Sequence, residues 1–102
     1  MSDDDILTGR IEEGACFTLQ ELCAACALEQ EWVVRRVEEG LFPVAGASSA
    51  EWRFTRIELA RAQRMRELER DFDAVPELAA LVADLLEEVD ELRARLRRAG
   101  LA

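Results

Sequence analysis

Histidine, tyrosine and lysine are all absent from this chain, so every basic residue is an arginine. Without histidine the chain lacks the commonest general base and the commonest metal ligand of proteins. Cysteine is scarce as well, and Cys16, Cys23 and Cys26 are odd in number and bunched together. No fourth thiol or histidine completes a zinc site, and the three thiols do not suggest a disulfide framework. We therefore expect no catalytic residue, no metal and no cofactor, in a protein from a reducing compartment.

Long apolar runs and a basic N-terminus are missing too. No stretch approaches the roughly 20 apolar residues that a transmembrane helix needs. The chain opens with Met1-Ser2-Asp3-Asp4-Asp5, which is acidic where a secretory signal would be basic. Half of the 102 residues are nevertheless apolar, which is sufficient for one folded domain. We expect a cytoplasmic protein that does not contact a membrane.

Positive charge is scarce relative to negative charge. The 13 arginines oppose 22 acidic residues, and the formal net charge is −9. A nucleic-acid binder needs a cationic surface that releases counterions from phosphate, and an acidic chain repels DNA. The charge therefore favours a basic protein as the partner.

What the sequence does contain is a repeated string, F-T-x-x-E-L, at residues 17–22 and again at residues 54–59. In each copy the threonine can cap a helix by accepting from the third amide, while the glutamate reaches back to the cap. The phenylalanine before the cap can pack on the leucine after it. Each copy therefore predicts the start of a helix, and the two starts lie 37 positions apart.

The first start predicts a helix-turn-helix. The first helix spans residues 18–26 and a bend follows at Ala27-Leu28. The second helix spans residues 29–39, and Gly40 ends it in the position where glycine terminates helices. Six residues have the spacing needed to pack the two helices together: Leu19, Leu22, Cys23, Leu28, Val33 and Val37.

A β-hairpin wing and two more helices are expected next. Residues 42–44 and 51–54 are short extended segments on either side of a turn of small residues. The third helix runs from Thr55 to about residue 70. We expect Asp73 to cap a fourth helix, whose first turn holds Pro76.

The fourth helix carries the clearest periodicity in the chain. Its apolar residues alternate steps of four and three, which is the heptad pattern of a two-stranded coiled coil with β-branched a and leucine d positions. Glu88 and Arg93 fall at g and e, the pair that meets in a parallel dimer. We expect a homodimer, with the orientation open; the alternative is that this face packs within the chain. The dimerisation residues are Leu78, Val82, Leu85, Val89, Leu92 and Leu96.

Three short motifs carry a family resemblance. They are residues 17–22, the E-G-L-F-P of residues 39–43 and the W-R-F of residues 52–54. Together with the order of elements they resemble the DNA-binding half of MerR-type regulators over about residues 16–80. The expected fold is mainly α, a MerR-like winged helix-turn-helix with a small β-hairpin wing and a C-terminal coiled-coil helix.

The resemblance fails at the positions that contact DNA in that family. Aligned on Gly40, its two phosphate-contacting arginines are replaced by Glu31 and Val34, and its tyrosine pair by Arg35 and Arg36. Over the stretch that would face DNA, six acidic residues oppose four arginines, which is the wrong sign for binding phosphate. DNA is therefore not the expected partner, although a MerR-like DNA-binding transcriptional regulator remains the alternative function.

A short acidic chain with a MerR-like module and a terminal coiled coil resembles the CbpM family of chaperone modulators. The F-T-x-x-E-L start, the wing exit at residues 51–54 and the break at Asp71-Phe72 fit that family's pattern. The resemblance implies a cytoplasmic protein that is not an enzyme. It implies binding to the J-domain of a DnaJ-like co-chaperone of the CbpA type, and inhibition of its co-chaperone activity towards DnaK. We divide the chain into an acidic N-terminal segment (1–15), the winged-helix module (16–74) and the C-terminal helix (75–102).

A J-domain presents a basic helix to its Hsp70 partner, so a competitor for that helix should offer carboxylates. Five acidic residues surround the helix break, with only Arg66 and Arg70 among them. Trp32 on the second helix would be a natural contact residue if it were exposed. The alternatives are that the carboxylates are ordinary solvated or capping residues and that Trp32 belongs to the core. The expected partner-binding residues are Glu67, Glu69, Asp71, Asp73, Glu77 and Trp32.

Overall fold

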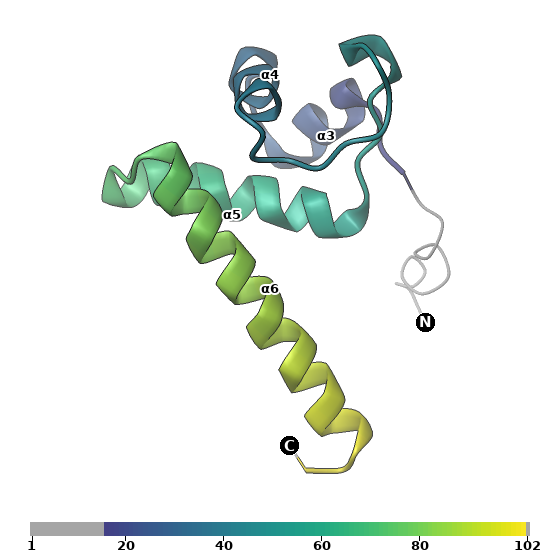
Figure 1. Ribbon diagram of the computed structural model, residues 1–102, viewed down its shortest axis with the longest axis vertical. Helices are drawn as coiled ribbons and strands as arrows, with labels where there is room; N and C mark the ends of the chain where they lie inside the picture. Colours follow the sequence, from purple (N-terminus) through teal and green to yellow (C-terminus); the bar gives the residue numbers. More distant parts are fainter. Residues whose placement is uncertain (1–15, 102) are drawn as a thin grey trace.

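Residues 16–101 are described by the computed structural model of this chain, and they form four α-helices and one turn of 3-10 helix. Helices α3 and α4 lie on one side of α5, and α6 turns back across α5 so that its C-terminal half projects away from the rest (Figure 1). This mainly α fold agrees with the expected class. The elements are α3 (Leu19–Cys26), α4 (Gln30–Glu38), η1 (Ser49–Glu51), α5 (Arg56–Phe72) and α6 (Pro76–Arg98).

Both predicted capping boxes are present. The Thr18 hydroxyl accepts from the Glu21 amide at 3.1 Å, and the Glu21 carboxylate accepts from the Thr18 amide at 2.9 Å. Thr55 and Glu58 make the same pair of contacts, at 3.4 and 2.7 Å. Each box satisfies amides that would otherwise have no partner at a helix start. The repeated string thus sets the first residue of both α3 and α5.

The two copies of the string also pair with each other. Phe17 and Phe54 form an antiparallel bridge in which each amide donates to the other's carbonyl, at 2.7 and 2.9 Å. Phe54 is fully buried. The starts of α3 and α5, far apart in the sequence, are therefore held side by side by backbone hydrogen bonds.

The β-hairpin wing expected over residues 42–54 is not confirmed. Among the described residues this segment holds one isolated antiparallel bridge, Ala45 to Arg53, and the η1 turn. Gly46 has φ +120°, and a Cβ there would lie 2.5 Å from the Glu51 carbonyl oxygen. The Glu51 carboxylate accepts a hydrogen bond from the Ala47 amide at 3.0 Å. The polar groups of residues 46–51 thus form hydrogen bonds within a tight turn. Too few extended residues remain on either side to form a two-stranded hairpin.

The connection between α5 and α6 differs from the expectation in one respect. Asp73 does not cap α6; it ends α5 in the left-handed conformation, with φ 56°. Val75 stands at the N-cap of α6 with no side-chain hydrogen bond, and Pro76 occupies the first turn as predicted. The residue before a proline is restricted to extended backbone, and an N-cap needs extended backbone. The position of Pro76 therefore places the cap at residue 75.

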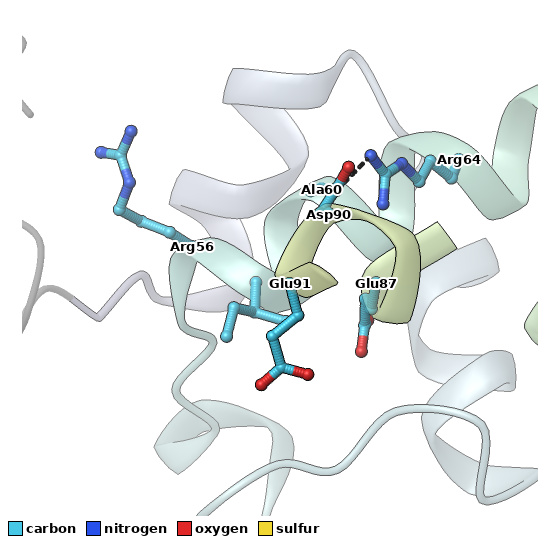
Figure 2. A pocket seen from close by; sticks show the side chains of 7 residues that line it. Arg56, Ala60, Arg64, Glu87, Asp90 and Glu91 are labelled. Carbon is cyan, nitrogen blue, oxygen red and sulfur yellow. Dashed lines mark hydrogen bonds and ion pairs between the residues drawn. The ribbon is translucent and has the colours of Figure 1, made fainter. Parts of the chain in front are cut away.

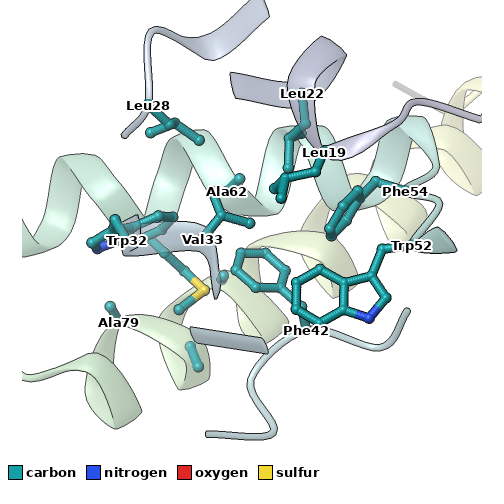
Figure 3. Packing of buried hydrophobic residues seen from close by; sticks show 13 residues of the cluster. Leu19, Leu22, Leu28, Trp32, Val33, Phe42, Trp52, Phe54, Ala62 and Ala79 are labelled. Atoms are coloured by element: carbon teal, nitrogen blue, oxygen red, sulfur yellow. The ribbon is translucent and has the colours of Figure 1, made fainter. Parts of the chain in front are cut away.

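The core is built around a chain of aromatic rings (Figure 3). Trp32 meets Phe42, Phe42 meets Phe54 and Phe54 meets Trp52, all edge to face with ring centroids 6.2–6.4 Å apart. The apolar residues predicted to join the first two helices are confirmed there. Four of them are buried and two are half-buried against the core: Leu19, Leu22, Leu28, Val33, Cys23 and Val37.

Helix α6 joins this core through its smallest side chains. Ala79, Ala80 and Ala83 are buried, and they belong to the same cluster as Ala62 and Met65 of α5. Alanines let two helix backbones approach closely, since no long side chain separates them. The first half of α6 is therefore fixed on α5, and the division of the chain at residue 75 stays a prediction.

Arginines of α5 extend the contact along α6. Arg61, which is 8% exposed, donates to the Leu41 carbonyl at 2.9 Å and pairs with Asp84. One turn further along α5, Arg64 pairs with Asp90 at 2.7 Å. These pairs lie beyond the alanines, so they set the angle at which α6 leaves the body.

Candidate functional site

Four exposed carboxylates surround the break between α5 and α6, and we call them the acidic elbow: Glu67, Asp71, Asp73 and Glu77. Within the described part of the chain, only Asp71 among them forms an ion pair, with Arg70 at 3.2 Å. Arg66 pairs with Glu29, the N-cap residue of α4, at 3.6 Å, and it lines one hollow of about 290 Å³ together with Glu67 and Arg70. The structure therefore exposes these four predicted residues on either side of the break, where they outnumber the two neighbouring arginines, Arg66 and Arg70.

Glu69 and Trp32, also predicted as partner-binding residues, lie elsewhere. The Glu69 carboxylate accepts from Trp32 Nε1 at 2.8 Å and from Arg36 Nε and NH2 at 2.9 and 2.8 Å. Trp32 is 3% exposed and the Arg36 guanidinium lies over its ring, 5.3 Å from the centroid. Trp32 was expected to contact a partner only if it were exposed, and its indole is instead packed in the core. This buried network joins α4 to α5 and leaves no free group for a partner.

The contacts between Glu69, Arg36 and Trp32 shift the pKa values of the two charged groups. Burial alone would raise the pKa of Glu69, but hydrogen bonds from Arg36 and Trp32 and the Arg36 charge hold that pKa below its ordinary value of 4.5. The pKa of Arg36 is raised, first by its hydrogen bond to Glu69. Both groups are therefore charged at neutral pH, and each stabilises the charged form of the other.

The six predicted dimerisation residues form a stripe on α6 that we call the leucine stripe. Five of them are exposed, with Leu78, Leu85 and Leu92 at 50–53%, and Val82 is half-buried. The alternative expectation, that this face packs within the chain, is therefore wrong. Two neighbours that the heptad pattern did not include, Leu81 and Leu86, are also exposed and widen the stripe.

The leucine stripe points away from α5. An α-helix turns about 100° per residue, so positions of type f lie opposite the a and d seam. The f positions are Ala80, Glu87 and Ala94, which are buried or half-buried towards α5. One face of α6 is thus fixed to the body, and the opposite face presents uncovered leucines along the projecting helix.

The face of α4 that reads DNA in MerR-type proteins carries little free positive charge. Arg36 is 8% exposed and is held by Glu69 and, at 3.2 Å, by Glu39. A shallow hollow of about 490 Å³ beside it is lined by Gln30, Glu31, Val34 and Arg35. One exposed arginine next to an exposed glutamate is a poor match for a phosphate backbone.

A groove of about 430 Å³ lies between the start of α5 and the middle of α6 (Figure 2). Ile57, 63% exposed, and Ala60 provide its apolar part. Arg64 pairs with Asp90 of α6 and closes one side, whereas the Arg56 side chain extends away from the α6 carboxylates (Figure 2). Because two arginines and three carboxylates line the groove, it offers a ligand no surface of a single charge sign.

The cysteines behave as packing residues. Cys23 and Cys26 are half-buried against the core, and burial raises the pKa of both thiols, which disfavours the reactive thiolate. Cys16 is exposed. Among residues 16–101 no helix is long and apolar enough to cross a membrane.

Most of the chain matches one family of known proteins. The family model described as MerR HTH family regulatory protein matches residues 17–99. A chaperone modulatory protein CbpM of Coxiella burnetii (strain Dugway 5J108-111) is 31% identical over 87 residues, 85% of this chain and 82% of the relative. The CbpM of Pseudomonas entomophila (strain L48) is 34% identical over 79 residues, 74% of each chain. No solved structure was found to match.

Proposed function

The chain belongs to the CbpM family of chaperone modulatory proteins, with a MerR-type helix-turn-helix fold, and we propose that it modulates a chaperone system by binding a co-chaperone. The proposed partner is the J-domain of a DnaJ-like co-chaperone of the CbpA type. By occupying that domain the protein inhibits the co-chaperone's activity towards DnaK. The protein has no catalytic role in this proposal.

The acidic elbow is the observation that carries the proposal. Its exposed carboxylates complement the basic helix that a J-domain offers to its Hsp70 partner, and the net charge of −9 steers the two proteins together. Because Glu69 and Trp32 are committed to the core, the proposed contact consists of Glu67, Asp71 and Asp73 on one side of the break and Glu77 on the other.

The leucine stripe has a separate proposed role, which is to form a homodimer. Burying the exposed half of each leucine is worth roughly 1 kcal/mol per side chain, and both copies contribute. That sum exceeds the lower values for the cost of association, about 4 kcal/mol. Glu88 and Arg93 would attract each other between parallel copies, whereas antiparallel copies would bring two Glu88 carboxylates together.

An ATPase assay tests the proposed inhibition. DnaK and its CbpA-type co-chaperone are mixed with increasing amounts of this protein, and the rate of ATP hydrolysis is followed. We expect the rate to fall towards that of DnaK alone as the J-domain is occupied. An unchanged stimulated rate with the protein in tenfold excess would contradict the proposal.

A DNA-binding transcriptional regulator is the second candidate, and the match to a MerR regulatory family favours it. The exposed arginines near α4 and the 42–54 segment are Arg35, Arg53 and Arg56, and exposed Glu31 and Glu51 interrupt them. A gel shift with the promoter of its own operon discriminates between the two functions. Sequence-specific binding that weakens steeply with salt would support the regulator, and no shift would support the chaperone modulator.

A further inference from the structure

Phe72 is the most exposed large apolar side chain in the described part of the chain, at 75%. It follows Met65 and Leu68 at helical spacing on the inner face of α5, where Met65 is fully buried and Leu68 is half-buried. The apolar face of α5 thus runs one turn past the end of the core. Within residues 16–101 the Phe72 ring is left largely uncovered, three residues beyond Glu69, where Arg36 of α4 contacts α5.

Phe72 and Val75 are the two exposed large apolar residues at the break between α5 and α6, and we call them the patch. Val75, which is 59% exposed, lies three residues further along the same break. Asp71 and Asp73 flank Phe72 in the sequence, and Glu77 follows Val75 by two residues. An exposed apolar centre with a charged rim is the usual composition of a protein-binding surface.

We propose that Phe72 and Val75 are the apolar anchor of this protein's partner-binding surface, and that their occupant is a basic amphipathic helix. The apolar face of that helix covers the two side chains, and its arginines and lysines pair with the rim carboxylates. The inference rests on the proposed J-domain binding, and it specifies where on this chain the partner docks. It also replaces Trp32, which is buried, with an aromatic residue that is accessible.

A second copy of this chain is a poorer occupant for the same patch. Two copies that met at Phe72 would bring Asp71, Asp73 and Glu77 of one copy against the same residues of the other, and like charges at an interface are costly. The leucine stripe has both signs of charge beside it at Glu88 and Arg93, so self-association is better accommodated there. The charge around the patch therefore selects a basic partner.

Two substitutions on the full chain test the anchor. In Phe72→Ala the exposed ring is removed with little effect on the core. In Val75→Thr the shape is kept while a hydroxyl is introduced at an N-cap that now lacks a side-chain hydrogen bond, so α6 should become more stable. Ile57→Ala is the matched control, because Ile57 is a comparably exposed apolar residue at the other end of α5.

Each variant is titrated calorimetrically against the cognate J-domain, and its size is measured by sedimentation. We expect Phe72→Ala to weaken binding by at least about 30-fold, the effect of a hot-spot residue, and Val75→Thr by about 3- to 10-fold. Ile57→Ala should bind like the wild type, and all variants should sediment like the wild type. Wild-type affinity in Phe72→Ala overturns the anchor while leaving the proposed function intact. Loss of the dimer in Phe72→Ala also overturns it, and a wild type that binds no J-domain overturns both.

Discussion

Replacing Glu69 by alanine should loosen the joint between α4 and α5. The substitution removes the acceptor of three hydrogen bonds and leaves the Trp32 N–H and the Arg36 guanidinium without that partner. Arg36 is 8% exposed and keeps only its weaker contact with Glu39. Breaking a buried ion pair by removing one partner costs about 3–5 kcal/mol, and the remaining Glu39 contact reduces this to about 3 kcal/mol here.

A loss of about 3 kcal/mol is a large part of the stability of a domain this size, which is typically about 5–15 kcal/mol. It corresponds to a decrease in Tm of roughly 12–24 °C. Urea unfolding followed by tryptophan fluorescence is a suitable assay, since Trp32 lies in the network itself. Glu67→Ala is the matched control, because Glu67 is an exposed glutamate on the same helix and forms no ion pair within the described residues. Its loss should change stability by less than about 0.5 kcal/mol.

Equal stability of the two variants would contradict the structural role of the Glu69 network. If Glu69→Ala and Glu67→Ala unfold at the same urea concentration with the same slope, the network does not hold α4 on α5. Glu69 would then be a solvated carboxylate, and its expected role as a partner-binding residue would regain support.

Three further predictions concern pH, size and charge. Because the pKa of Glu69 is lowered in the folded state, its stabilisation is fully present above its ordinary pKa of 4.5 and is lost as the pH falls through the lowered value. The stability gap between wild type and Glu69→Gln should therefore close between pH 5 and acid pH in urea titrations; a constant gap would contradict it. Leu85→Gln with Leu92→Gln should yield monomers by sedimentation that still bind a J-domain, though less avidly, and complete loss of binding in a folded monomer would make the leucine stripe the partner surface. Asp71→Lys with Asp73→Lys should keep the size, weaken binding and flatten its salt dependence, and unaltered binding would remove the acidic elbow from the interface.

Helix starts were predictable from the sequence because a capping box is a local pattern. Thr18 and Thr55 both cap helices through contacts within three residues. The wing was not predictable in the same way, since the number of ladder pairs depends on how the turn closes. The backbone at Gly46 lies close to Glu51, and the strand propensities of the residues do not predict such a contact.

The candidate site shows the same division between local and tertiary information. The heptad spacing was visible in the sequence, and so was the acidic character of the break. That Glu69 is committed to Arg36 depends on how α4 packs across α5, 33 residues away in the chain. The exposure of Phe72 likewise depends on where the core ends. The spacing of apolar residues along α5 does not show that position.

The most direct test of the account is a calorimetric titration of the full chain into the isolated J-domain of its cognate CbpA-type co-chaperone. We expect saturable binding at micromolar concentrations, and weaker binding as salt is raised, because exposed carboxylates meet a basic helix. The absence of any binding heat at tens of micromolar, at several temperatures and with both proteins folded, would contradict it.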